Sequence, residues 1–138
     1  MPKPDAETGL VVSYDYLWQS DKDRGWQEGG EHRPCVVVSG SPPGSVLICG
    51  VSRSEPHDPA YGIELDDEHK SALSLVSDRQ WIHCNEINII SWDDPELRPN
   101  PYGGWEYGYL GSVVGKQMLD KVRAIKAAGG LPTIKREL

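Results

Sequence analysis

The chain has 138 residues, with 14 Lys and Arg against 21 Asp and Glu, which gives a net charge of -7 at pH 7. This length suits one domain whose core is large enough to fold without disulfides or metals. With 38% hydrophobic and 25% charged residues, the composition excludes a disordered chain, and no apolar run reaches the roughly 18 residues of a membrane span.

Short apolar runs are separated by 15 Gly and 11 Pro, a pattern typical of a small all-β domain. The predicted strands cover residues 10–18, 35–38, 46–52, 61–65 and 81–92. The last of them is expected to bend near Asn85. The predicted connections are a long polar loop over 19–32, a turn over 41–44 and a proline-containing loop over 93–104. The run that starts at Cys35 is wholly apolar, which indicates a strand buried on both faces.

Two helices are predicted. Residues 66–75 form one or two turns with Asp66 or Asp67 as the N-cap. Ser112 is expected to cap a closing helix that ends near Gly129. The apolar stripe of this closing helix is formed by Val114, Met118, Val122 and Ile125. These elements predict a mainly β protein, a small β-barrel with a short helix and a C-terminal helix.

The N-terminus contains no apolar signal-peptide core, and the three cysteines show no CxxC spacing. An odd number of unspaced cysteines argues against a disulfide framework and indicates the cytoplasm. We therefore expect Cys35, Cys49 and Cys84 to be small core residues, with a zinc site as the less favoured alternative. No metal or other cofactor is expected.

Charge is unevenly distributed along the chain. Residues 1–110 hold 8 basic and 19 acidic side chains, a balance of -11, whereas residues 111–138 hold 6 basic and 2 acidic ones, a balance of +4. The acidic body weighs against a plain nucleic-acid binder, because contact with phosphates requires Lys and Arg. The basic C-terminal segment indicates either an interaction surface or an ordinary solvated helix face.

The sequence contains no P-loop, GxGxxG or HExxH motif, but two predicted strand ends carry groups suited to anions. Arg33 directly precedes an apolar strand, and its planar guanidinium matches phosphate oxygens in a bidentate fork. Ser52 and Arg53 end a neighbouring strand and could converge on the same anion. The alternative for both places is an ordinary polar strand end at the surface.

Five tryptophans, in a chain without phenylalanine, offer broad apolar surface for core packing or for stacking against bases. We expect Trp81 and Trp92 to lie mainly in the core. Trp18 and Trp26 flank the long polar loop and are the better candidates for a surface role.

The order of these features resembles the PemK/MazF family of toxin endoribonucleases, in particular a PemK-like branch. The likeness begins with Gly9-Leu10-Val11-Val12 and Tyr14-Asp15-Tyr16-Leu17-Trp18. A Gly-rich loop and Arg33-Pro34-Cys35-Val36-Val37-Val38 follow. It continues through residues 50–56, 62–65, 71–75 and 81–92. The resemblance covers about residues 9–110, and no single motif in it is diagnostic.

The resemblance implies an SH3-like β-barrel of the PemK/MazF/CcdB type over residues 9–110. Residues 1–8 are then a flexible N-terminus, and residues 111–138 a C-terminal helix with a basic tail. A toxin of this family is usually a homodimer with an antitoxin partner. It cleaves single-stranded RNA without a metal, because the 2′-hydroxyl attacks the neighbouring phosphate and leaves a 2′,3′-cyclic phosphate.

The resemblance assigns the catalytic roles to Arg33 and Ser52, the latter where the family has Thr. A guanidinium and a hydroxyl there would stabilise the charge that develops on the phosphate oxygens. Arg33 is expected to act as a charge stabiliser or an acid rather than a base, since the pKa of arginine lies above about 12. His32 is the candidate base. The residues expected to contact RNA are Arg53, His32, Trp18, Arg24 and Asn88.

Three positions depart from the branch. Arg53 stands where it has His, Gly50 where it has Pro, and Asn88 where several relatives carry a basic residue. These departures, together with the acidic body, keep a second hypothesis open: a catalytically silent or gyrase-directed, CcdB-like binding protein on the same fold. A phage or host regulatory protein that reuses the fold is a third hypothesis.

Overall fold

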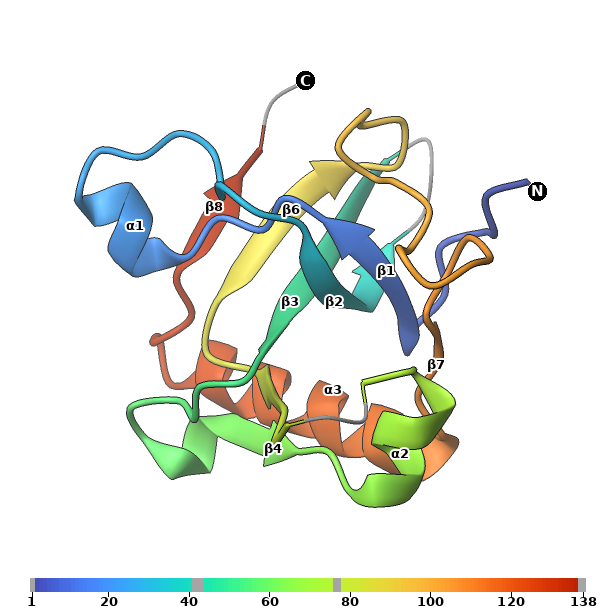
Figure 1. Cartoon of the computed structure of the whole chain (residues 1–138). Helices are drawn as coiled ribbons and strands as arrows, with labels where there is room; N and C mark the ends of the chain where they lie inside the picture. The colour runs from blue at the N-terminus through green and yellow to red at the C-terminus, as the bar shows by residue number, and fades with distance from the viewer. Residues whose placement is uncertain (1, 41–43, 76–77, 137–138) are drawn as a thin grey trace.

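The computed structural model describes residues 2–40, 44–75 and 78–136. Over these residues the chain forms one eight-stranded sheet with three α-helices and a 3-10 turn (Figure 1). The strands are β1 (Leu10–Tyr14), β2 (Arg33–Gly40), β3 (Ser45–Ser52), β4 (Gly62–Glu64), β5 (Trp81–His83), β6 (Ile87–Ser91), β7 (Gly108–Tyr109) and β8 (Thr133–Lys135). The helices are α1 (Gln19–Asp23), α2 (Asp67–Ala72) and α3 (Ser112–Ala127), and the 3-10 turn is η1 (Pro59–Tyr61).

Strand β3 organises the sheet. Antiparallel strands run in the order β4-β5-β3-β2-β1-β7. On the edge of β3 away from β2, its first half pairs with β6 and its last two residues pair with β5. Strand β8 then adds to β6 in parallel. The sheet therefore curls around β3, as Figure 1 shows, and the fold is mainly β and compatible with a small barrel.

Both faces of the sheet are buried. In β2, Cys35 and Val37 belong to one core cluster, whereas Val36 and Val38 belong to the other. Alternate residues of a strand point to opposite faces, so each face contributes its own core. The prediction that this apolar run is buried on both faces is confirmed.

Helix α3 lies across one face of the sheet (Figure 1). Met118 and Val122 of the predicted stripe are buried in the core. The helix begins at Ser112 with Gly111 as its N-cap and no side-chain cap, so the prediction that Ser112 caps it is wrong. Gly111 has the extended backbone of an N-cap residue, and glycine is one of the residue types found at this position. No helix in the described part of the chain is both long and apolar enough to cross a membrane.

Several other elements follow the predictions, with local differences. Asp66 is the N-cap of α2, and its carboxylate accepts a hydrogen bond from the His69 amide at 2.8 Å. The predicted strand 81–92 is divided into β5 and β6. The single short helix α1 lies inside the stretch predicted as loop, and β7 and β8 were not predicted. The predicted turn over 41–44 lies, except for its last residue, outside the described residues.

The N-terminal residues, expected to be flexible, make specific contacts with the sheet. Thr8 Oγ1 donates to the Val38 carbonyl at 2.8 Å, and Trp92 Nε1 donates to the Pro4 carbonyl at 3.1 Å. Lys3 also donates to the Trp92 carbonyl. The first residues of the described chain are thus part of the same fold as the sheet.

Candidate functional site

A polar cleft of about 700 Å³ opens where β2 begins and β3 ends. The strand register explains why these ends meet: Cys35 pairs with Gly50, and this antiparallel register carried two residues further brings Arg33 opposite Ser52. The cleft brings together five of the seven residues predicted from the sequence, namely Trp18, His32, Arg33, Ser52 and Arg53.

Arg33 is held at the cleft by contacts on two sides. Its guanidinium lies over the Trp18 ring at 5.1 Å from the ring centroid, and its Nη2 pairs with the Glu31 carboxylate. Its Nε is buried and has no hydrogen-bond partner among the described residues. Because a buried donor without an acceptor is costly, this nitrogen is suited to bind an oxygen of a ligand.

The place of Trp18 depends on Gly50. A Cβ built at Gly50 would lie 2.7 Å from the Trp18 ring, so the indole occupies the space that a side chain on β3 would need. The ring also packs edge-on against Tyr16 and His83, with centroid distances of 4.7 and 4.9 Å. Trp18 is thus a fixed aromatic wall beside Arg33, and the departure at Gly50 has a structural reason.

Ser52 and Arg53 supply a hydroxyl and a second guanidinium. Ser52 Oγ accepts a hydrogen bond from the Ser54 amide at 3.1 Å, which leaves its hydroxyl proton to donate elsewhere. Arg53 is exposed, and its Nη1 lies 3.2 Å from Oδ2 of Asp78. Each arginine of the cleft is therefore paired with a carboxylate, Arg33 with Glu31 and Arg53 with Asp78.

His32 lies beside a third carboxylate. Its Nε2 is 2.9 Å from Oε2 of Glu96, although the contact does not have the direction of a straight hydrogen bond. A neutral imidazole has one acceptor nitrogen, so a ring at this place could take a proton from a substrate.

His83, which was not predicted as a site residue, lies behind Trp18 and is not among the residues that line the cleft. One of its ring nitrogens, Nε2, lies 2.8 Å from the Ser54 carbonyl, and its ring touches Trp18. Burial lowers the pKa of His83, which favours the neutral ring at pH 7. Its position on β5, next to the end of β3, follows from the pairing of Ser52 with Trp81. No motif in the sequence signals this neighbourhood.

Two tyrosines that the sequence reasoning also missed line the cleft. Tyr102 is 66% exposed, and its ring lies 6.2 Å from that of the half-buried Tyr107. Tyr102 stands between Pro101 and Gly103 in the predicted proline-containing loop. Because loops run over the protein surface, an aromatic residue in this loop could have been predicted to be exposed.

Two of the predicted RNA contacts lie elsewhere. Asn88 is completely buried, and its amide accepts from the Leu17 N–H at 2.9 Å and donates to the Leu17 carbonyl at 2.8 Å. A buried amide used in this way does not fit the prediction that Asn88 contacts RNA. Arg24 is exposed but pairs with Asp21 and stacks on Trp26, and it is not among the residues that line the cleft.

The cysteines are core residues, as predicted. All three are buried, and burial raises the pKa of Cys84 to about 12 and the pKa of Cys35 and Cys49 well above normal. A thiol of this kind is a poor nucleophile, because the thiolate is the reactive form. In the described part of the chain, no three His, Cys, Asp or Glu side chains gather as a metal site.

Comparison with known protein families and with curated proteins finds no match for this chain. The fold and the cleft define a class only: a mainly β protein with a curled sheet and a polar cleft that holds arginine, serine, histidine and aromatic side chains. The function has to be argued from these side chains.

Proposed function

We propose that this protein is a PemK/MazF-like toxin, a metal-independent endoribonuclease that acts on single-stranded RNA in the cytoplasm. The proposal includes an SH3-like barrel, a homodimer and a cognate antitoxin protein. The observation that carries it is the cleft in which Arg33, with a buried and unpartnered Nε, shares one wall with Ser52. Donors of this kind suit a phosphate better than a neutral ligand.

The reaction would proceed by attack of a ribose 2′-oxygen on the adjacent phosphorus. His32 accepts the 2′-hydroxyl proton, and the bond between phosphorus and the 5′-oxygen breaks. The 5′-oxygen leaves with a proton from solvent, so the products are a 2′,3′-cyclic phosphate and a 5′-hydroxyl. Arg33 and Ser52 donate hydrogen bonds to the phosphate oxygens as negative charge accumulates on them.

The aromatic side chains of the cleft would stack on the bases of the RNA. Trp18 and Tyr102 line the cleft from two separate segments of the chain. Stacking on such rings tolerates any base and works on unpaired strands, whose bases are free to turn outward. The cleft therefore supports single-stranded RNA as the substrate rather than a duplex.

One observation favours the second candidate, a catalytically silent or gyrase-directed binding protein. Each cleft arginine is already paired with a carboxylate, Arg33 with Glu31 and Arg53 with Asp78. A phosphate would have to compete with these ion pairs, within a body whose charge balance is strongly acidic.

Induced expression in bacterial cells followed by mapping of RNA 5′ ends tests the two candidates. The wild type should generate new 5′-hydroxyl ends, and Arg33→Ala should generate none. Arg123→Ala is the matched control, because Arg123 lies exposed on α3 away from the cleft, and it should behave as the wild type. Growth arrest with intact RNA would reject the nuclease and support the binding protein.

A further inference from the structure

Arg136, at the end of the described chain, is a buried cation. Its side chain and that of Asp15 are each 9% exposed, the most deeply buried ion pair among the described residues. It stands directly after β8, in the basic C-terminal segment to which the proposed function assigns no role. A buried charge is costly unless it is fully paired, so its contacts indicate what it supports.

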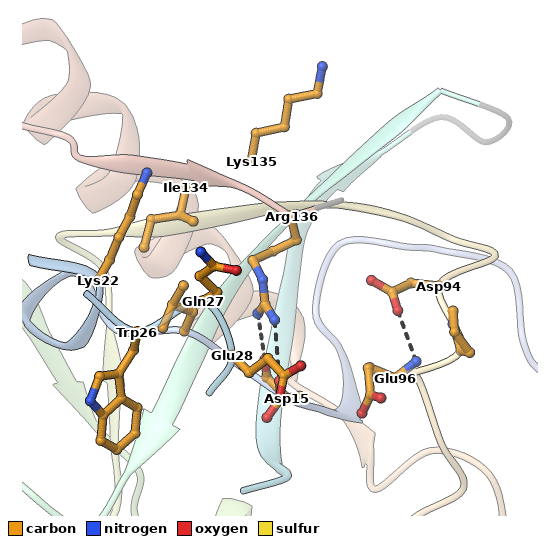
Figure 2. A pocket seen from close by; sticks show the side chains of 12 residues that line it. Asp15, Lys22, Trp26, Gln27, Glu28, Asp94, Glu96, Ile134, Lys135 and Arg136 are labelled. Carbon is orange, nitrogen blue, oxygen red and sulfur yellow. Dashed lines mark hydrogen bonds and ion pairs between the residues drawn. The ribbon is translucent and has the colours of Figure 1, made fainter. Parts of the chain in front are cut away.

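The guanidinium of Arg136 bonds three acceptor oxygens on two residues, Asp15 and Asn88. Nη1 donates to the Asp15 carbonyl at 2.5 Å and to Oδ1 of Asn88 at 3.2 Å, and Nη2 lies 3.2 Å from Oδ2 of Asp15. Figure 2 shows the two bonds to Asp15 at the floor of a second hollow, of about 510 Å³. The guanidinium also lies over the Tyr14 ring, 5.2 Å from its centroid.

Asp15 and Asn88 each form further hydrogen bonds to a segment that leads to the cleft. The Asp15 carboxylate accepts a hydrogen bond from the Gly29 amide at 2.9 Å, and Gly29 belongs to the loop that carries His32 and Arg33. The Asn88 amide holds both backbone groups of Leu17, the residue before Trp18. Arg136 is therefore linked to the two segments that place Arg33 and the ring stacked on it.

The loop backbone passes close to the segment that follows β1. A Cβ built at Gly29 would lie 2.2 Å from the Tyr16 carbonyl, so only glycine fits at this position. At the same place Oδ2 of Asp15 accepts hydrogen bonds from both the Gly29 amide and the Arg136 guanidinium, so one oxygen joins the loop to Arg136.

The backbone, rather than the side chain of Arg136, makes the hydrogen bonds that pair β8 with the sheet. Strand β8 pairs with β6 through backbone bonds, and the Arg136 amide itself donates to the Ile89 carbonyl at 2.8 Å. The guanidinium turns instead toward Asp15, directly after β1 (Figure 2), and it also bonds Asn88 of β6. Its contacts are thus with the supports of the cleft rather than with its own strand.

We infer that Arg136 is a positioning residue that fixes the Gly29 loop and Trp18, and through them the Arg33 guanidinium, in the proposed RNA cleft. Its effect on RNA cleavage rests on the proposed function, whereas its effect on the loop does not. The inference gives the C-terminal segment a role, since a chain that lacks this arginine would keep the sheet but lose the ordered cleft.

Amide hydrogen exchange measured on the purified protein tests the positioning without any RNA. In Arg136→Met, exchange over residues 16–31 should rise by about 10-fold or more, while exchange in β2 and β3 stays at the wild-type level. Arg136→Lys should fall between the two, because it keeps the charge but not the planar fork. Arg123→Met, on the exposed face of α3, is the matched control and should change nothing.

A second variant covers a failure to fold. Without Arg136 the Asp15 carboxylate is a buried, unpaired charge, and Arg136→Met could fail to fold for that reason. The double variant Arg136→Met/Asp15→Asn removes this charge and keeps an amide oxygen that accepts from the Gly29 N–H. It should fold and still exchange faster over residues 16–31. Unchanged exchange in this region, or a uniform rise across the sheet, would overturn the inference.

Cleavage kinetics separate this inference from the proposed function. If the wild type cleaves RNA, kcat of Arg136→Met should fall by about 10- to 100-fold with partial recovery in Arg136→Lys, because misplaced groups slow the chemical step. An unchanged kcat together with a loosened loop would overturn the positioning role. If the wild type cleaves no RNA, the proposed function fails, and the exchange result alone decides whether Arg136 fixes the loop.

Discussion

Tyr102 is the most exposed aromatic side chain among the described residues, at 66%, and it lines the cleft. If it stacks on a base, Tyr102→Ala removes about 1–3 kcal/mol of binding, which raises KM about 5- to 150-fold with little change in kcat. Tyr109→Ala is the matched control, since Tyr109 is 50% exposed on β7 and does not line the cleft. Steady-state cleavage of an RNA oligonucleotide measures both. Equal KM values for Tyr102→Ala and the wild type would exclude the stacking role.

The buried carboxyl of Glu86 predicts how the stability of the protein depends on pH. Burial raises its pKa, against a hydrogen bond from the Gln19 amide at 2.9 Å that lowers it. A raised carboxyl pKa in the folded state favours folding below the unfolded pKa, and this contribution is lost as pH rises through the folded pKa. Glu86→Gln keeps an acceptor for Gln19 without the charge. We expect it to unfold at higher urea than the wild type at pH 7, with the difference shrinking toward pH 4.

The exposed Glu55 provides the control for this experiment. Glu55→Gln should follow the wild-type dependence of urea midpoint on pH. If Glu86→Gln and the wild type show parallel profiles from pH 4 to pH 7, the Glu86 carboxyl is not perturbed in the folded protein.

At the scale of elements, α3 is part of the core rather than an appendage. Met118 is completely buried against the sheet, and Met118→Ala should lower the free energy of unfolding by about 2–5 kcal/mol. On the same helix Val113 is 70% exposed, so Val113→Ala should change the free energy of unfolding by no more than about 0.5 kcal/mol. Urea unfolding followed by circular dichroism compares the two. Similar small losses for both would mean that α3 does not stabilise the sheet.

The elements that the sequence predicts well are those with a recognisable pattern in their own residues. The apolar runs of β2 and β3, the Asp66 cap of α2 and the Met118 stripe of α3 can each be recognised from their own residues. Strands β7 and β8 have two and three residues and become strands only by pairing with β1 and β6. Their formation depends on tertiary contacts, which no local pattern encodes.

The same limit applies to the site. Arg33 and Ser52 end long strands whose pairing brings them together, so their joint place in the cleft was predictable. Asn88 is the polar second residue of β6, and only the packed structure shows that it faces Leu17 and Arg136 rather than solvent. The placement of His83 beside Trp18 likewise depends on the pairing of β3 with β5.

At the scale of the whole molecule, the charge distribution limits how RNA is bound. The body has a balance of -11 over residues 1–110, and the cleft offers two arginines for phosphates. Each phosphate contact to a single strand contributes about 0.7 to the salt dependence, so log K should fall with log salt with a slope of about -1.4. Arg53→Gln should reduce the slope to about -0.7. Fluorescence anisotropy of a labelled RNA in increasing KCl gives both values.

A much steeper slope would contradict this picture. Slopes of about -3 or steeper would require more than the two cleft cations, so that basic side chains outside the cleft would have to bind the RNA as well. Because residues 1–110 hold few cations, the slope distinguishes binding at the cleft alone from binding that also uses other basic side chains.

The most direct test of the account is the chemistry of the product. Purified protein incubated with a single-stranded RNA oligonucleotide in the presence of EDTA should yield fragments with a 2′,3′-cyclic phosphate and a 5′-hydroxyl, identified by mass spectrometry. Arg33→Ala should yield none, and Arg123→Ala should match the wild type. Cleavage by Arg33→Ala at the wild-type rate, or an intact oligonucleotide with the folded wild type, would contradict the assignment of this cleft as an RNA-cleaving site.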